Sequence, residues 1–179
     1  TNHQPVGEVP VLSAWEIVDT FRRCELNGWE KFCCLQPPYS ILRRAMECEH
    51  FPMSRRTGLG NMIWSPLEGG WLSGRYRIGA QPAETSPRLE RWIQNVEDPK
   101  FARRRAAIEK LAGLVETKGV DMAEFSLAWT LTEPAVTSAI IGPRTSEQLE
   151  GCLRSLSVQV TEADREAVDA IVPPGETVL

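Results

Sequence analysis

The 179-residue sequence lacks the patterns that mark several large classes of protein. It has no apolar run near the ~20 residues that a membrane-spanning helix needs, which argues against a membrane protein. A net charge of −4 and a pI near 5.3 give no electrostatic basis for nucleic-acid binding. No starting Met, basic segment or apolar segment opens the sequence, so we see no signal peptide and expect a chain that begins midway. The arginines form short clusters that we expect to be solvated helix faces: 22–23, 43–44, 55–56 and 103–105.

Cysteine and histidine are too few and too scattered to indicate a metal or disulfide site. The five cysteines are odd in number and lack CxxC spacing. Cys33 and Cys34 are adjacent, so on a strand their side chains would point to opposite faces and could not form a disulfide. We therefore expect reduced thiols in a cytoplasmic protein. The two histidines, His3 and His50, do not suffice for a zinc site.

Short apolar segments alternate with amphipathic ones, in a chain that is 42% hydrophobic and 25% charged. This alternation predicts an α/β fold with a parallel sheet. Strands are expected at 31–35, 59–64 and 136–141. Helices are expected at 13–28, 41–57, 101–118, 122–132, 145–156 and 161–172. Residues 75–99 read as a long loop with one turn near 89–93.

Helix start and stop signals support this assignment. Ser13 and Glu16 have capping-box spacing, residues 161–164 open the last helix, and Asp121 is a suitable N-cap. In the first helix, the apolar face is expected to carry residues 15, 18 and 21. Three strands are too few to close a (β/α)8 barrel, which needs roughly 250 residues.

Ligands of parallel α/β folds bind at the carboxyl ends of the strands, so the three loops that follow the strands are the candidate site. Gln36 follows the first strand, and its amide could hold a carboxamide or a sugar. Trp64 follows the second, where it could stack on a heteroaromatic ring beside a glycine-containing loop suited to pyrophosphate. Arg144 follows the third, just before a helix, and could bind phosphate. The plainer alternatives are a loop-bracing Gln36, a core Trp64 and a surface Arg144.

Catalytic motifs are missing. No histidine lies beside a Ser or Cys, and the sequence contains no HExxH, Walker or GxGxxG motif. Nothing marks any of the loop acids as a catalytic pair: Glu68, Glu84, Glu97 and Asp98. The residues alone therefore predict a nucleotide site without identifiable catalytic machinery.

Three motifs together resemble the aldo-keto reductase family: QPPYS at 36–40, IWSPLEGGWLSGRY at 63–76 and TSAIIGPRTSEQL at 137–149. The closing AIVPPG at 170–175 is similar to the late helix and tail of that family. The resemblance covers only the second half of a (β/α)8 barrel. It implies one incomplete domain over 1–179, with the last three strands, their helices and an extra C-terminal helix.

The resemblance implies NADP(H) as cofactor and assigns it to the strand ends. The implied cofactor-binding residues are Asn2, Gln36, Trp64, Ser65, Leu67, Gly69, Arg144 and Gln148. Asn2 and Gln36 would hold the nicotinamide carboxamide, and Trp64 would stack on the ring. Ser65, Leu67 and Gly69 would line the pyrophosphate path. Arg144 would meet the 2′-phosphate, and Gln148 would lie near the adenosine. Two departures are Gly151–Cys152, where the family commonly has Glu-Asn, and His3 in place of the usual Phe.

The family's catalytic Asp, Tyr, Lys and His lie on the first four strands and have no counterpart here, so neither Tyr39 nor Tyr76 is expected to be the proton donor. The leading interpretation is the cofactor side of an NADPH-dependent carbonyl reductase whose substrate is a small carbonyl compound. Its partner would be an N-terminal half or a second copy. The alternative is a non-catalytic, truncated module that acts through a partner. A third interpretation, an enzyme of other chemistry built on half a barrel, has less support.

Overall fold

The computed structural model describes residues 12–75, 77 and 98–178. Three parallel strands form one sheet in the order β1-β2-β3: β1 (Cys34–Leu35), β2 (Gly60–Ile63) and β3 (Ser138–Ala139). In the register, Leu35 pairs with Asn61 and Ile63 pairs with Ala139. The parallel α/β prediction is confirmed. The two outer strands are shorter than predicted, and the longest strand is β2, which has a partner on each side.

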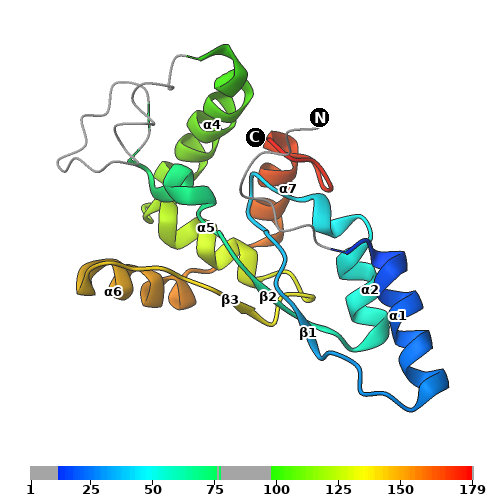
Figure 1. The fold of residues 1–179 in the computed structure, drawn as a ribbon. Helices are drawn as coiled ribbons and strands as arrows, with labels where there is room; N and C mark the ends of the chain where they lie inside the picture. The colour runs from blue at the N-terminus through cyan, green and yellow to red at the C-terminus, as the bar shows by residue number, and fades with distance from the viewer. Residues whose placement is uncertain (1–11, 76, 78–97, 179) are drawn as a thin grey trace.

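Two helices pack beside β1: α1 (Ala14–Asn27) and α2 (His50–Thr57) (Figure 1). The predicted capping box opens α1, where Glu16 accepts hydrogen bonds from the Ser13 backbone N–H at 2.8 Å and from its hydroxyl at 2.6 Å. The predicted apolar face of α1 is partly wrong, because Trp15 is 69% exposed and Val18 is 47% exposed. The face that meets the sheet and α2 instead carries Ala14, Ile17, Phe21 and Cys24.

A single helix over 41–57 was expected, and this prediction is wrong. The segment folds into a turn, a short 3-10 helix η1 (Ala45–Glu47) and then α2. Ile41, Leu42 and Arg44 are all buried, although in a helix Leu42 and Arg44, two positions apart, would point to different faces. The turn that buries all three is stabilised by the Ser40 hydroxyl, which accepts a hydrogen bond from the Leu42 N–H at 3.2 Å.

The chain after β2 forms η2 (Glu68–Ser73), η3 (Pro99–Phe101), α4 (Ala102–Lys118) and α5 (Met122–Leu131). After β3 come α6 (Ser146–Arg154), η4 (Ser155–Ser157) and α7 (Glu162–Ile171). The predicted cap Asp121 is confirmed and accepts from the N–H groups of Ala123 and Glu124. Most of the predicted 75–99 loop, with its turn near 89–93, lies outside the described residues. Among the described helices, none is long and apolar enough to cross a membrane.

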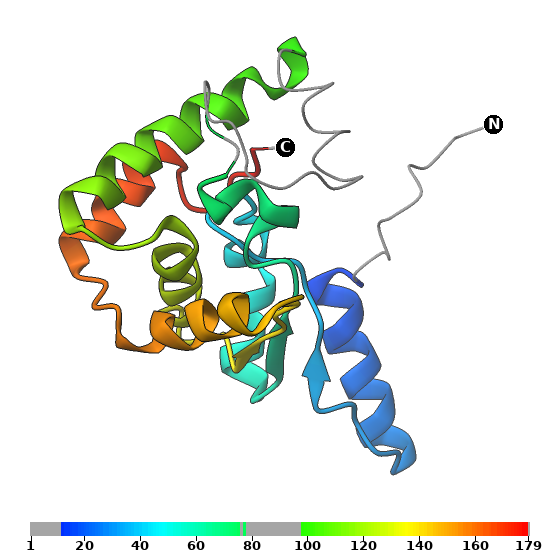
Figure 2. The ribbon, with the colours of Figure 1, turned by 90° about the vertical axis from the view of Figure 1, so that its left-hand side faces the viewer.

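The two faces of the sheet differ. Leu35, Ile63 and Ala139 point to the face that the helices cover, with Ile63 in the main core beside residues of α4, α5 and α7. Since side chains alternate along a strand, Met62 and Ser138 point to the opposite face, and Ser138 is exposed. Figures 1 and 2 show α1 beside β1 at one edge and α6 beside β3 at the other. One face of the sheet thus lacks cover from the described residues, and neither outer strand has a further strand partner among them.

Two of the arginine clusters are not solvated helix faces, which corrects the sequence prediction. Arg44 is 2% exposed and pairs with Glu47 at 2.8 Å and Asp169 at 2.7 Å. Arg104 is 7% exposed and lies over the Trp71 ring, 4.8 Å from its centroid. Both guanidinium groups are held in the interior by carboxylates or aromatic rings, which composition alone does not reveal.

Candidate functional site

The carboxyl ends of β1 and β2 lie together. The backbone N–H of Trp64 donates to the Pro37 carbonyl at 3.0 Å, and its indole Nε1–H donates to the backbone carbonyl of Gln36 at 3.0 Å, which leaves the Gln36 side-chain amide uninvolved in this bond. Trp64 is half-buried and Gln36 is exposed. The indole is therefore fixed in direction by the first loop while part of it remains accessible, so Trp64 is not a residue of the closed core.

The loop after β2, residues 65–70, contains several left-handed backbone conformations. Ser65 has φ 58° and Glu68 has φ 46°, values that are unfavourable for residues with a side chain. Gly69 and Gly70 follow with φ 65° and 103°. Strained backbone of this kind persists only where surrounding contacts impose it, and it concentrates at ligand sites.

Internal hydrogen bonds of this loop determine which donors remain for a ligand. The N–H of Glu68 donates to the Ser65 carbonyl at 2.8 Å, and that of Gly69 donates to the Ser65 hydroxyl oxygen at 3.2 Å. Gly70 donates to the Leu67 carbonyl at 2.9 Å. These three amides are thus already used, which limits the backbone contribution to phosphate binding. Because Ser65 Oγ accepts from Gly69, its own proton can be donated to a phosphate oxygen.

Leu67 and Gly69 occupy different environments within the loop. The Leu67 side chain packs against the main core and anchors the loop. A Cβ atom added at Gly69 would meet no heavy atom within 4 Å, so space is open beside it. This opening, next to the Ser65 hydroxyl, suits the approach of an extended anionic group.

Arg144 and Gln148 lie at the end of β3, where α6 begins. The N-cap Thr145 accepts from the Gln148 N–H at 3.2 Å, and Gln148 Oε1 accepts from the Arg144 N–H at 2.8 Å. The side chains of Thr145 and Gln148 therefore stabilise the start of the helix, and Arg144 is exposed beside it. A guanidinium group next to a helix N-terminus is a favourable environment for phosphate.

The structure brings most of the predicted site residues to one edge of the sheet. Gln36, Trp64 and the loop 65–70 adjoin each other, and β3 pairs with β2, which makes their following loops neighbours. The Ile140 N–H donates to the Ile63 carbonyl at 2.8 Å, which extends this pairing toward Arg144. Asn2 lies outside the described residues.

Tyr39, which was not expected to be the proton donor, lies in the core. It is 1% exposed, and its hydroxyl donates to Glu47 at 2.7 Å. Burial raises the pKa of Tyr39 far above its ordinary value, and the neighbouring Glu47 carboxylate raises it further. Tyr39 therefore has neither the access nor the acidity of a proton donor.

Sequence reasoning missed the buried ion pair of Glu68, which it left among unmarked loop acids. The side chain of Glu68 is 9% exposed and forms an ion pair with Arg43 at 2.9 Å. It also accepts from the hydroxyl of the fully buried Ser40 at 3.1 Å. The only signal was an acidic residue inside a glycine-containing loop, and its inward direction could not be read from the sequence.

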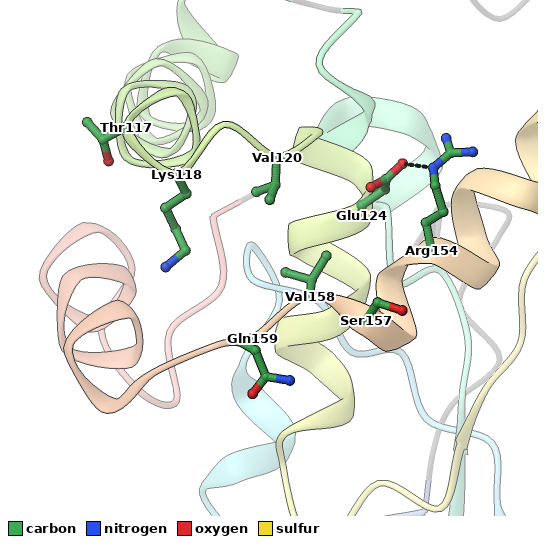
Figure 3. Close-up of a pocket in the computed structure, with 8 residues that line it drawn as sticks. All are labelled: Thr117, Lys118, Val120, Glu124, Arg154, Ser157, Val158 and Gln159. Atoms are coloured by element: carbon green, nitrogen blue, oxygen red, sulfur yellow. Dashed lines mark hydrogen bonds and ion pairs between the residues drawn. The ribbon is translucent and has the colours of Figure 1, made fainter.

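A depression of about 590 Å³ lies elsewhere, between the end of α4, the start of α5 and η4 (Figure 3). Its charged side chains already have partners: Lys118 pairs with Asp164 at 2.8 Å, and Glu124 pairs with Arg154 at 2.7 Å. The described residues contain no cluster of His, Cys, Asp and Glu suited to a metal ion. The strand ends are therefore the better candidate for a ligand site.

The aromatic residue, the polar loop and the arginine thus lie at the carboxyl ends of parallel strands, which is where parallel α/β proteins bind their ligands. The chain belongs to the aldo/keto reductase family, whose family model matches residues 11–173. The predicted resemblance is thereby confirmed.

Two curated relatives match nearly the whole chain, and a third matches about two thirds of it. An uncharacterized oxidoreductase of Bacillus subtilis, YrpG, is 31% identical over 165 residues, which cover 92% of this chain and 48% of the relative. The versiconal hemiacetal acetate reductase of Aspergillus parasiticus is 25% identical, with 92% and 49% covered. A probable voltage-gated potassium channel subunit beta of Arabidopsis thaliana is 30% identical, with 69% and 38% covered. The chain thus spans about half the length of the first two relatives, and less of the third.

Proposed function

We propose that the chain forms the cofactor side of an NADP(H)-dependent aldo-keto reductase and corresponds to the last three strands of its (β/α)8 barrel. The observation that carries the proposal is the joint position of Trp64 and Gln36 at the strand ends, linked by the 3.0 Å Nε1–H bond. The open loop at 65–70 and the exposed Arg144 support it.

The residues present fit a nicotinamide dinucleotide. Gln36, with Asn2, would hold the carboxamide, and Trp64 would contact the ring. The Ser65 hydroxyl, with Leu67 and Gly69, would line the pyrophosphate path. Arg144 would pair with the 2′-phosphate, and Gln148 would lie near the adenosine. Bound there, the cofactor would supply a hydride to a small carbonyl substrate of the complete enzyme.

Catalysis requires groups beyond this cofactor side. We assign the proton donor and its activating residues to an N-terminal half-barrel, because the described residues offer no exposed tyrosine beside the strand ends. We place the protein in the cytoplasm, away from membranes and nucleic acid. The five cysteines are free, which agrees with a reducing compartment.

The solution species is expected to be larger than one chain. The open strand edges and the uncovered face need a partner, either an N-terminal half or a second copy. Light scattering of the purified 20.0 kDa chain at micromolar concentration measures this directly. A monomeric mass combined with cooperative thermal unfolding would contradict the expectation.

Substitution of the strand-end tryptophan tests the cofactor assignment. We expect Trp64→Ala to weaken NADPH and NADH alike, by about three- to tenfold, the range of one lost aromatic contact. Trp29→Ala is the matched control, since Trp29 is 65% exposed beyond the end of α1. Calorimetric titration of both cofactors would show unchanged affinities for the control. Equal affinities of Trp64→Ala and the unsubstituted chain would count against the proposal.

A non-catalytic binding module is the second candidate. It is supported by the match to a relative named as a probable channel subunit and by Gly151–Cys152, which replace the family's usual Glu-Asn. Both candidates share the cofactor site and differ in turnover. Aldehyde reduction by the chain together with its physiological partner would favour the reductase, and cofactor binding without turnover would favour the module.

A further inference from the structure

The buried carboxylate beneath the loop 65–70 has no role in the cofactor contacts proposed above. Glu68 belongs to the loop, yet its side chain points away from solvent to Arg43 and Ser40. Its Oε1 lies 2.9 Å from Arg43 Nη2, and its Oε2 lies 3.1 Å from Ser40 Oγ. Desolvation offsets much of the attraction in a buried ion pair, but removal of one partner leaves the other charge buried and uncompensated.

Ser40 and Arg43, the two residues that hold the Glu68 carboxylate, are themselves held by backbone contacts. Ser40 and Arg43 exchange two backbone hydrogen bonds, at 3.2 and 3.0 Å. Arg43 also forms an isolated bridge with Thr177, near the C-terminus. The carboxylate is therefore attached to a rigid base made of two segments, and movement of the loop would break several contacts at once.

A second arginine lies close to this ion pair. Arg104, 7% exposed, lies over Trp71 and close enough to Glu68 and Arg43 for their charges to affect its pKa. Burial lowers the pKa of Arg104, the Glu68 carboxylate raises it, and Arg43 lowers it further. The Glu68 carboxylate thus lies near two guanidinium groups, those of Arg43 and Arg104.

We propose that Glu68 is a positioning residue, whose carboxylate, held by Arg43 and Ser40, keeps the strained loop 65–70 in the form that receives the cofactor pyrophosphate. The left-handed backbone at Ser65 and Glu68 is the observation that requires such an anchor. This inference rests on the proposed cofactor site, and it assigns to that site a residue that would not itself touch the cofactor.

Two probes separate positioning from general stability. NADPH crosses the loop with its pyrophosphate, whereas adenosine 2′-monophosphate carries only the part assigned to Arg144 and Gln148. We expect Glu68→Gln to weaken NADPH by about tenfold, the order of coupling seen for contacting charged groups. The affinity for adenosine 2′-monophosphate should not change. Arg43→Gln should give the same loss, and the double variant should lose little more.

Glu133→Gln provides the matched control. Like Glu68, Glu133 is a buried carboxylate: it pairs with Arg55 at 2.7 Å and accepts from the Ala135 N–H at 3.1 Å. It lies in the segment before β3, away from the loop 65–70. It should leave both affinities unchanged even if the melting temperature falls. Should Glu68→Gln fail to fold, Ser40→Ala removes one bond to the carboxylate and should give a smaller loss confined to NADPH.

Calorimetric titration of each variant decides among the outcomes. A loss confined to NADPH supports positioning. Unchanged NADPH affinity in Glu68→Gln, or equal losses for both probes, overturns the role of Glu68 and leaves the cofactor site intact. Absence of NADPH binding to the unsubstituted chain overturns the proposed function, and this inference with it.

Discussion

The 179-residue chain, supplied with NADPH and an aldehyde, is expected to oxidise no cofactor. Tyr39 is buried on Glu47, and no other tyrosine lies among the described residues. Loss of general acid catalysis alone lowers a rate by about 10²–10⁴-fold, and loss of the groups that align the substrate lowers it further. The loss of NADPH absorbance over time measures this rate.

A complete aldo-keto reductase assayed in parallel is the positive control for the aldehyde and the cofactor. Trp64→Ala serves as the internal control, because turnover at the proposed site depends on the cofactor that Trp64 contacts. Aldehyde-dependent oxidation of NADPH that survives purification and falls in this variant would contradict the expected inactivity. It would show that the chain contains a proton donor of its own.

Arg144→Ala is expected to remove the preference for NADPH over NADH. A charge-assisted contact with the 2′-phosphate contributes about 1.5–3 kcal/mol, or roughly ten- to a hundredfold in affinity. NADH lacks that phosphate, so its affinity should stay nearly constant. Calorimetric titration of both cofactors into both proteins gives the four dissociation constants that the comparison needs.

The matched control for this substitution is Arg23→Ala. Arg23 is an exposed arginine of α1 whose partner Asp19 is on the same helix. It should leave both cofactor affinities unchanged, apart from a small general effect of the lost charge. If the unsubstituted chain binds NADPH and NADH equally, Arg144 is a surface charge and the cofactor assignment loses its main support.

The elements that the sequence predicted well depend on neighbouring residues. The predicted Ser13–Glu16 capping box forms, because it joins residues three positions apart. The predicted helix over 41–57 failed for the opposite reason. Arg44 is held by Asp169, a contact across 125 positions, and no local pattern reveals such a partner.

The candidate site likewise has one part that the sequence predicts and one part that depends on distant contacts. Gln36 and Trp64 could be placed together in advance, because the carboxyl ends of parallel strands share one edge of a sheet. The direction of the Glu68 side chain could not be anticipated. It depends on Arg43, 25 positions earlier, and on a burial that only the assembled fold creates.

Mapping of NADPH binding by heteronuclear NMR tests the central claim most directly. With ¹⁵N-labelled chain, addition of NADPH should shift the Trp64 indole N–H signal and the amide signals of Gln36, Ser65, Gly69 and Arg144. The residues that line the depression near Lys118 and Glu124 should keep their positions. Shifts centred on that depression, or no saturable shifts at the strand ends, would contradict the account.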